Sequence, residues 1–186
     1  MRPATVPLLG AICLGAVLLI GDRSLAGAQG DANLVFSNDC LRYVVGPDGA
    51  NCSFVDVATG KDYCRQSPAT PVARVSLEGK WHNAASASLE GDRLLLTFVE
   101  TSATVTLRMT THKRHFVLEV LQASPGIDEL QFPNVQLIPQ TAGQADFTSC
   151  ALALNLQTNV TTMPGPSDRV MASCVARFGI VGASVA

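Results

Sequence analysis

Residues 84–122 constrain the fold more than any other part of the chain, because apolar and polar residues alternate along them. In three segments an apolar side chain stands at every second position, the period of a strand with one buried face. These positions are Leu94, Leu96 and Phe98, then Val105, Leu107 and Met109, then Phe116, Leu118 and Val120. Polar breaks at 90–92, 100–102 and 111–114 have the length of hairpin loops. The stretch therefore predicts a four-stranded antiparallel meander.

The last segment of this meander is apolar on both faces apart from Glu119. A strand with two apolar faces lies inside a sheet rather than at its edge. Glu119 interrupts that strand, and we expect it either to face solvent or to pair with Arg108 of a neighbouring strand rather than to act in catalysis.

Further strand patterns stand on both sides of the meander. We expect strands at 41–45, 52–57 and 72–77 before it, and at 130–137, 151–156 and 170–178 after it. Pro133 cannot donate a ladder hydrogen bond, so the strand that contains it should be an edge strand or carry a bulge. The pattern predicts an all-β fold, built as an antiparallel β-sandwich.

Residues 1–28 have the pattern of a secretory signal peptide. Arg2 is the charged start, residues 6–20 are mostly apolar, and small residues precede the expected cut after Ala28. The apolar run is shorter than the roughly 20 residues that span a bilayer, which favours a signal peptide over the alternative of a retained anchor. We therefore expect a secreted or periplasmic protein, with no membrane attachment after cleavage and one β-sandwich domain at 29–186.

The charge balance argues against nucleic acid as a partner. The chain has 13 Lys and Arg against 15 Asp and Glu, and it contains one Trp and two Tyr. Binding to nucleic acid usually relies on a basic surface, and binding to single strands also on several aromatic side chains that stack on bases. The composition shows no excess of basic residues, and we expect no stacking platform from one Trp, two Tyr and seven Phe.

Export would place the cysteines in a compartment where disulfides persist. Cleavage of the signal leaves an odd number of them: Cys40, Cys52, Cys64, Cys150 and Cys174. A hairpin turn at 58–60 would bring Cys52 nearly opposite Cys64, so this is the first candidate disulfide. Cys150 with Cys174 is the second candidate, which leaves Cys40 free. No CxxC spacing occurs and the histidines join no ligand cluster, so we expect no metal site and no cofactor.

A family resemblance begins in residues 41–64, LRYVVGPDGANCSFVDVATGKDYC. This order of strand, glycine turn, strand and DVATGK turn resembles the first hairpins of the galactose-mutarotase-like β-supersandwich. CALALNLQTNV from Cys150 and ARFGIVGASVA from Ala176 resemble segments of large exported bacterial proteins that join such a domain to a catalytic domain. The resemblance implies a supersandwich fold and an association with carbohydrate, as in the N-terminal domains of secreted glycoside hydrolases. It assigns no catalytic residue.

Residues 178–186 are small and mostly apolar up to the last position, whereas domains usually finish in a polar tail. We therefore expect the chain to be an N-terminal fragment of a longer protein, whose C-terminal catalytic domain would be its partner. Two glycosylation sequences occur, at Asn51 and Asn159, and they would be silent in a bacterial source.

The candidate binding residues are Trp81, His82 and Asn83, which include the only tryptophan. An aromatic face beside amide and imidazole groups suits a sugar ring, although such a tryptophan can also simply pack on a loop. Catalysis of glycoside hydrolysis needs two carboxylates a few ångströms apart. Asp128 and Glu129 are adjacent and would point to opposite faces of a strand, so they make a poor pair.

Three functions follow from these observations. The first is a non-catalytic carbohydrate-associated module of a secreted glycoside hydrolase. The second is a free-standing extracellular carbohydrate-binding module. The third, a complete mutarotase-like enzyme, is the least favoured, because a full supersandwich with a His base and a Glu acid would need roughly 250 residues.

Overall fold

A computed structural model describes residues 32–138, 147–161 and 169–186 of the chain. Its strands are β1 (Leu34–Ser37), β2 (Leu41–Val45), β3 (Asn51–Asp56), β4 (Arg74–Leu77), β5 (Lys80–Glu90), β6 (Arg93–Phe98), β7 (Thr104–Thr111), β8 (Phe116–Ala123), β9 (Glu129–Gln136), β10 (Thr158–Asn159), β11 (Arg169–Val175) and β12 (Ser184–Val185). A short 3-10 helix, η1 (Ala176–Phe178), follows β11. All pairings between these strands are antiparallel, so the predicted all-β antiparallel class is confirmed.

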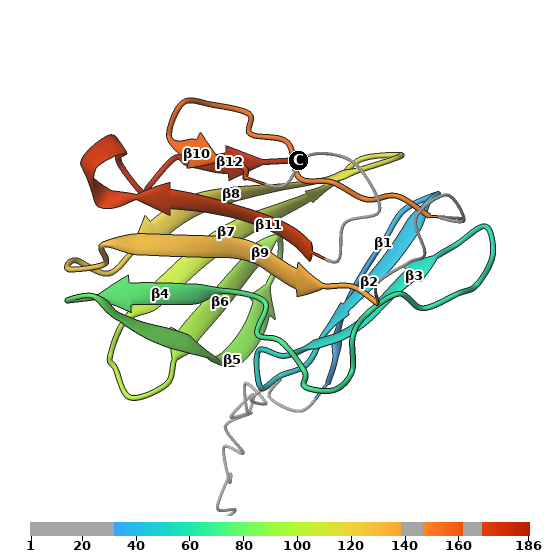
Figure 1. Cartoon of the computed structure of the whole chain (residues 1–186), viewed down its shortest axis with the longest axis horizontal. Coiled ribbons are helices and arrows are strands. Elements are labelled where there is room, and N and C mark those ends of the chain that lie inside the picture. Colours follow the sequence, from blue (N-terminus) through green and yellow to red (C-terminus); the bar gives the residue numbers. More distant parts are fainter. Residues whose placement is uncertain (1–31, 139–146, 162–168) are drawn as a thin grey trace, which may run out of the picture.

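The strands form one large sheet and one small sheet rather than two layers of similar size. The large sheet has the order β10-β11-β9-β4-β5-β6-β7-β8-β12, and the small one the order β1-β2-β3. The ends of the large sheet meet, because residues 152–154 pair with β12 while β10 pairs with β11. Leu152 and Ala186 exchange backbone hydrogen bonds of 2.8 and 2.9 Å there. The large sheet is therefore nearly closed into a barrel (Figure 1).

The predicted meander is confirmed in β5 to β8. Its apolar positions are the buried ones, and Leu94 pairs with Leu107 as Leu96 pairs with Val105. β8 lies between β7 and β12, as its two apolar faces predicted. Arg108 Nη1 lies 3.2 Å from Glu119 Oε2 on the neighbouring strand, which confirms the expected ion pair.

Pro133 lies in β9, which is an interior strand between β11 and β4. The expectation of an edge strand is wrong, but that of an irregularity is confirmed. The register between β9 and β11 shifts between Met171 and Ser173, close to the proline, and the ladder with β4 ends at Gln131. Pro133 therefore falls where neither neighbour needs its missing N–H.

Residues 151–156, expected as a strand, make only the bridge Ala153–Val185 and a few backbone hydrogen bonds to the end of the chain. The period-two leucines face solvent: Leu152, Leu154 and Leu156 are 55%, 52% and 100% exposed. The alternation of these leucines therefore reflects an extended backbone and does not mark a buried face. The strand expected at 170–178 ends earlier, where η1 begins.

The small sheet packs against one end of the barrel, and a single hydrophobic core includes side chains from both sheets. Asn51 on β3 ties the two together and is 1% exposed. Its amide nitrogen donates to the Thr70 carbonyl and hydroxyl and to the Asn134 carbonyl of β9, at 2.8, 3.0 and 2.9 Å. Its amide oxygen accepts from the Tyr43 hydroxyl at 2.5 Å. A residue that stood out in the sequence only as a glycosylation acceptor is thus a buried structural link.

The predicted signal peptide at 1–28 lies outside the described residues. Within them, no helix has both the length and the apolar character needed to cross a membrane.

Candidate functional site

Trp81, His82 and Asn83 all lie on β5, but they do not share one face. The register between β4 and β5 is regular from Leu77–Lys80 to Arg74–Asn83, so adjacent side chains alternate. Trp81 and Asn83 are exposed on the outer face. His82 is half-buried on the opposite face, and its Nδ1 lies 2.9 Å from the Val99 carbonyl oxygen. The structure therefore brings Trp81 and Asn83 together on one face and places His82 apart from them.

The outer face around Trp81 is organised by Arg74 of β4. The Arg74 guanidinium lies over the indole, 4.5 Å from the ring centre, an arrangement that a flat cation and an aromatic face favour. Arg74 Nε also donates to Gln131 Oε1 of β9 at 2.6 Å. Gln131 Nε2 in turn lies 3.4 Å from Glu129 Oε1. A connected set of planar side chains thus runs from β5 across β4 to β9.

Strand register explains why these side chains meet. One row across the sheet joins Asn83, Arg74, Gln131 and Ser173, and the next joins Trp81, Ser76, Glu129 and Val175. We call these eight residues the outer rows. Paired residues on one face of an antiparallel sheet lie close enough for their side chains to interact.

The centre of the outer rows is shielded from solvent although it lies outside the barrel. Ser76, Gln131 and Ser173 are 7%, 7% and 8% exposed. Burial lowers the pKa of Arg74, nearby Arg169 lowers it further, and Glu129 partly opposes this. The guanidinium is therefore partly dehydrated and held flat between the indole and the Gln131 amide, which makes it a preorganised donor.

A polar hollow of about 490 Å³ continues the outer rows towards η1. Glu129, Ser173 and Val175 belong to both features, and the rest of the described wall comes from residues 156–159, Cys174 and η1. Phe178 is 56% exposed there, and the Arg177 guanidinium lies 4.4 Å from its ring centre. An exposed aromatic ring with an arginine beside it thus occurs at each end of a largely polar strip.

This arrangement is suited to binding rather than to acid–base catalysis. Its donors and acceptors are guanidinium, amide, hydroxyl and carboxylate groups, and its aromatic faces can contact C–H surface. The outer rows contain one carboxylate, that of Glu129. Asp128, next to it, accepts from the Gly79 N–H at 3.4 Å and does not belong to the rows. In the described residues no group of three or more His, Cys, Asp and Glu side chains is placed to hold a metal ion.

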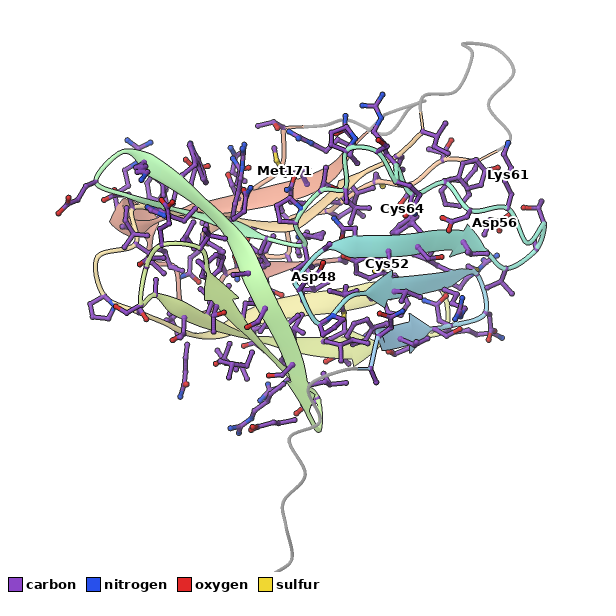
Figure 2. The ribbon with its side chains drawn as sticks, turned by 90° about the horizontal axis from the view of Figure 1, so that it is seen from below. Asp48, Cys52, Asp56, Lys61, Cys64 and Met171 are labelled. Carbon is purple, nitrogen blue, oxygen red and sulfur yellow. The ribbon has the colours of Figure 1, made fainter. Side chains whose placement is uncertain are left out.

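The candidate disulfide cysteines are free thiols in this structure. The turn at 58–60 is present, and the Asp56 N–H donates to the Lys61 carbonyl across it. The chain reverses direction at this turn, so Cys64 lies near Cys52 (Figure 2). Burial is the main cause that raises the pKa of Cys64 to about 12, followed by Asp62 and Cys52. The Cys52–Cys64 bond stays a prediction, and so does a Cys150–Cys174 bond.

Arg74, Gln131, Glu129 and Ser173 were not expected at this site. Each strand on its own shows only a polar residue at alternate positions, and their convergence depends on β9 pairing with both β4 and β11. The pairing of β9 with β4 alone joins segments more than 50 residues apart, since Arg74 and Gln131 are separated by 57 positions.

We compared the chain with protein-family models, with curated proteins and with solved structures, and none of them matches it.

Proposed function

We propose that the chain binds carbohydrate through the outer rows, as a non-catalytic module. The observation that supports this most is Trp81, an exposed indole that lies on the same face as Asn83 and against Arg74, while Arg74 also donates to the Gln131 amide. A sugar ring offers C–H surface to an aromatic face and hydroxyl groups to planar donors and acceptors. The outer rows supply both at neighbouring positions.

The module would belong to a secreted glycoside hydrolase, and its catalytic domain would lie elsewhere in that protein. The fold and the single carboxylate of the outer rows agree with a binding role. A relation to the galactose-mutarotase-like supersandwich is part of this proposal, supported by the resemblance of residues 41–64 and by the antiparallel all-β architecture.

A free-standing extracellular carbohydrate-binding module is the alternative. The DNA sequence downstream of the codon for Ala186 distinguishes the two. A reading frame that continues into a catalytic domain supports the hydrolase module, and a stop codon supports the free-standing binder.

The binding proposal is tested with a glycan array followed by isothermal titration calorimetry of the best glycan. Trp81→Ala should weaken binding at least tenfold, about 1.4 kcal/mol, because the stacking surface is lost. His82→Ala is the matched control, since it changes the neighbouring residue on the opposite face and should leave affinity unchanged. Equal affinities of wild type and Trp81→Ala, or no glycan bound at all, would remove the outer rows as a carbohydrate site.

A further inference from the structure

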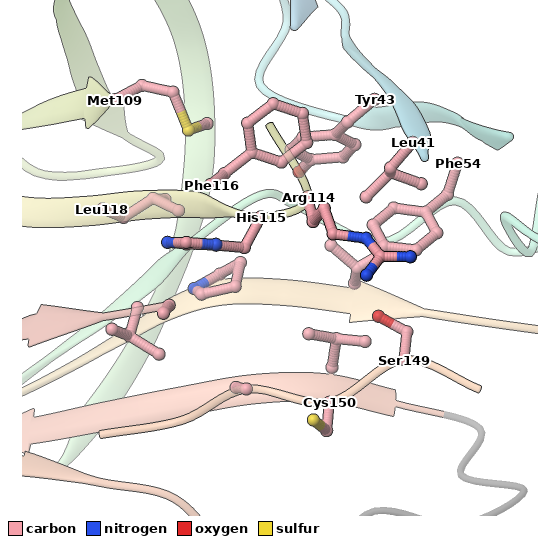
Figure 3. A pocket seen from close by; sticks show the side chains of 16 residues that line it. Leu41, Tyr43, Phe54, Met109, Arg114, His115, Phe116, Leu118, Ser149 and Cys150 are labelled. Carbon is pink, nitrogen blue, oxygen red and sulfur yellow. The ribbon is translucent and has the colours of Figure 1, made fainter. Parts of the chain in front are cut away.

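A second, separate pocket lies where the small sheet meets the end of the barrel (Figure 3). It encloses about 130 Å³. Apolar side chains form most of its wall: Tyr43 and Phe54 come from the small sheet, and Met109, Leu118 and Val170 come from the barrel. The ends of β-barrels are common places for ligand sites.

The polar side chains of this pocket gather on two segments. Arg114 and His115 come from the hairpin between β7 and β8, and Ser149 comes from the segment before residue 151. In Figure 3 the Arg114 guanidinium projects between Phe54 and Ser149. Among the lining side chains that the structure describes there is no Asp or Glu, and Arg114 is the permanently charged one; the backbone of Ala186 also lines the pocket.

The hairpin that carries these groups is tied down on both sides. The His115 ring stacks on that of His112 with centres 4.6 Å apart, and the His112 N–H donates to the His115 carbonyl at 2.9 Å. On its other side, the Lys113 carbonyl accepts from the Asp39 N–H at 3.2 Å. The backbone that carries Arg114 and His115 is therefore fixed beside the apolar opening, although both side chains are exposed.

We propose that this pocket binds a short aliphatic monocarboxylate of about six carbons. Its volume is close to that of an engineered apolar cavity of about 150 Å³ that accepts benzene, and it is well below that of a site for a drug-sized ligand. The apolar wall favours the hydrocarbon chain, and a carboxylate at the opening would accept from Arg114, with the Ser149 hydroxyl and the His115 ring within the same rim. This site shares no residue with the outer rows, so it stands whether or not they bind carbohydrate.

Chain length gives the first test. The full chain is titrated by calorimetry with straight-chain carboxylates from butanoate to decanoate, all below their micelle concentrations. Affinity should rise about fourfold per methylene up to about six carbons and then stop rising, because each buried methylene contributes a nearly constant amount until the pocket is full. A steady rise through decanoate indicates adsorption to exposed apolar surface, and this result or a lack of saturable binding would overturn the proposal.

The head group gives the second test. Hexanoate should bind about fivefold more tightly than hexan-1-ol or hexylamine, and Arg114→Gln should abolish that preference. Lys113→Gln is the matched control, because it removes a charge from the same hairpin at a residue that does not line the pocket. Equal binding of acid and alcohol to the wild type refutes the recognition of an anion.

Filling the pocket gives the third test. Ala151→Leu adds bulk inside it, whereas Ala153→Leu adds the same bulk at an exposed position two residues away. Only the first variant should lose hexanoate binding, and thermal unfolding of both is recorded. If Ala151→Leu does not fold, the head-group experiment decides the matter, since Arg114 is exposed and its replacement leaves the core intact.

Discussion

Replacement of Asn51 by alanine should reveal how strongly the two sheets depend on each other. Asn51 makes four hydrogen bonds while only 1% exposed, to Tyr43, to two atoms of Thr70 and to Asn134. Alanine would leave the Tyr43 hydroxyl and the Asn134 carbonyl oxygen buried without this partner, whereas the Thr70 carbonyl keeps the backbone N–H of residue 51. Each such group costs about 1–3 kcal/mol, and because the groups can relax together we expect a total of about 3–5 kcal/mol.

The assay is equilibrium unfolding in urea, followed by circular dichroism and by the fluorescence of the single tryptophan. The midpoint should fall while the slope stays constant, because the change acts on stability and not on the surface exposed by unfolding. Tyr43→Phe removes only the hydroxyl, and should cost about 1–2 kcal/mol in the wild type and less in the Asn51→Ala background. Asn83→Ala, at an exposed position, is the control and should stay within about 0.5 kcal/mol of wild type.

A loss below about 1 kcal/mol in Asn51→Ala would refute the reasoning, and so would full additivity with Tyr43→Phe. Either result would mean that water replaces the amide or that the two sheets are not linked through this residue.

Two further predictions concern ionisable groups. In the reduced protein, where Cys64 and Cys174 are free thiols, burial raises the pKa of both to about 12 from an ordinary value of 9.0, so the folded state holds these protons more tightly than the unfolded state does. Their contribution to stability is therefore fully present below pH 9.0 and is lost as pH rises towards about 12. The midpoint of urea unfolding should fall over this pH range. The fall should be smaller in Cys174→Ala, which has one of these two thiols fewer. Glu119→Gln removes an ion pair with Arg108 in which each side chain is 40% exposed, and Arg108 keeps Asp92 at 3.2 Å. We expect a cost below about 1 kcal/mol in the same assay, and a cost above about 2 kcal/mol would show a far stronger pair than its exposure allows.

The meander could be predicted because each of its strands pairs with the next one in sequence. Leu94, Leu107 and Leu118 carry their own period-two signal, and short loops then leave little choice of partner. The positions of β4, β9 and β11 could not be predicted in this way, because β9 pairs with a strand from before the meander and with one from near the end of the chain.

The candidate site could be predicted only in part for the same reason. Trp81 stands out in the sequence because it is the only tryptophan. Arg74 becomes the partner of both Trp81 and Gln131 only after β4, β5 and β9 align. His82 was grouped with Trp81 because the two are adjacent in sequence, whereas adjacency within a strand places side chains on opposite faces.

The joining of the large sheet at its two ends has a consequence for synthesis. β8 and β9 have been synthesised by Gln136. One edge of β8 pairs with β12 and one edge of β9 pairs with β11, and both partners follow some tens of residues later. Until those segments leave the ribosome, two long rows of backbone N–H and C=O groups stay open to other chains. A nascent chain paused at this stage would therefore be the form most prone to self-association. The pairing of β11 with β9 and of β12 with β8 ends this exposure.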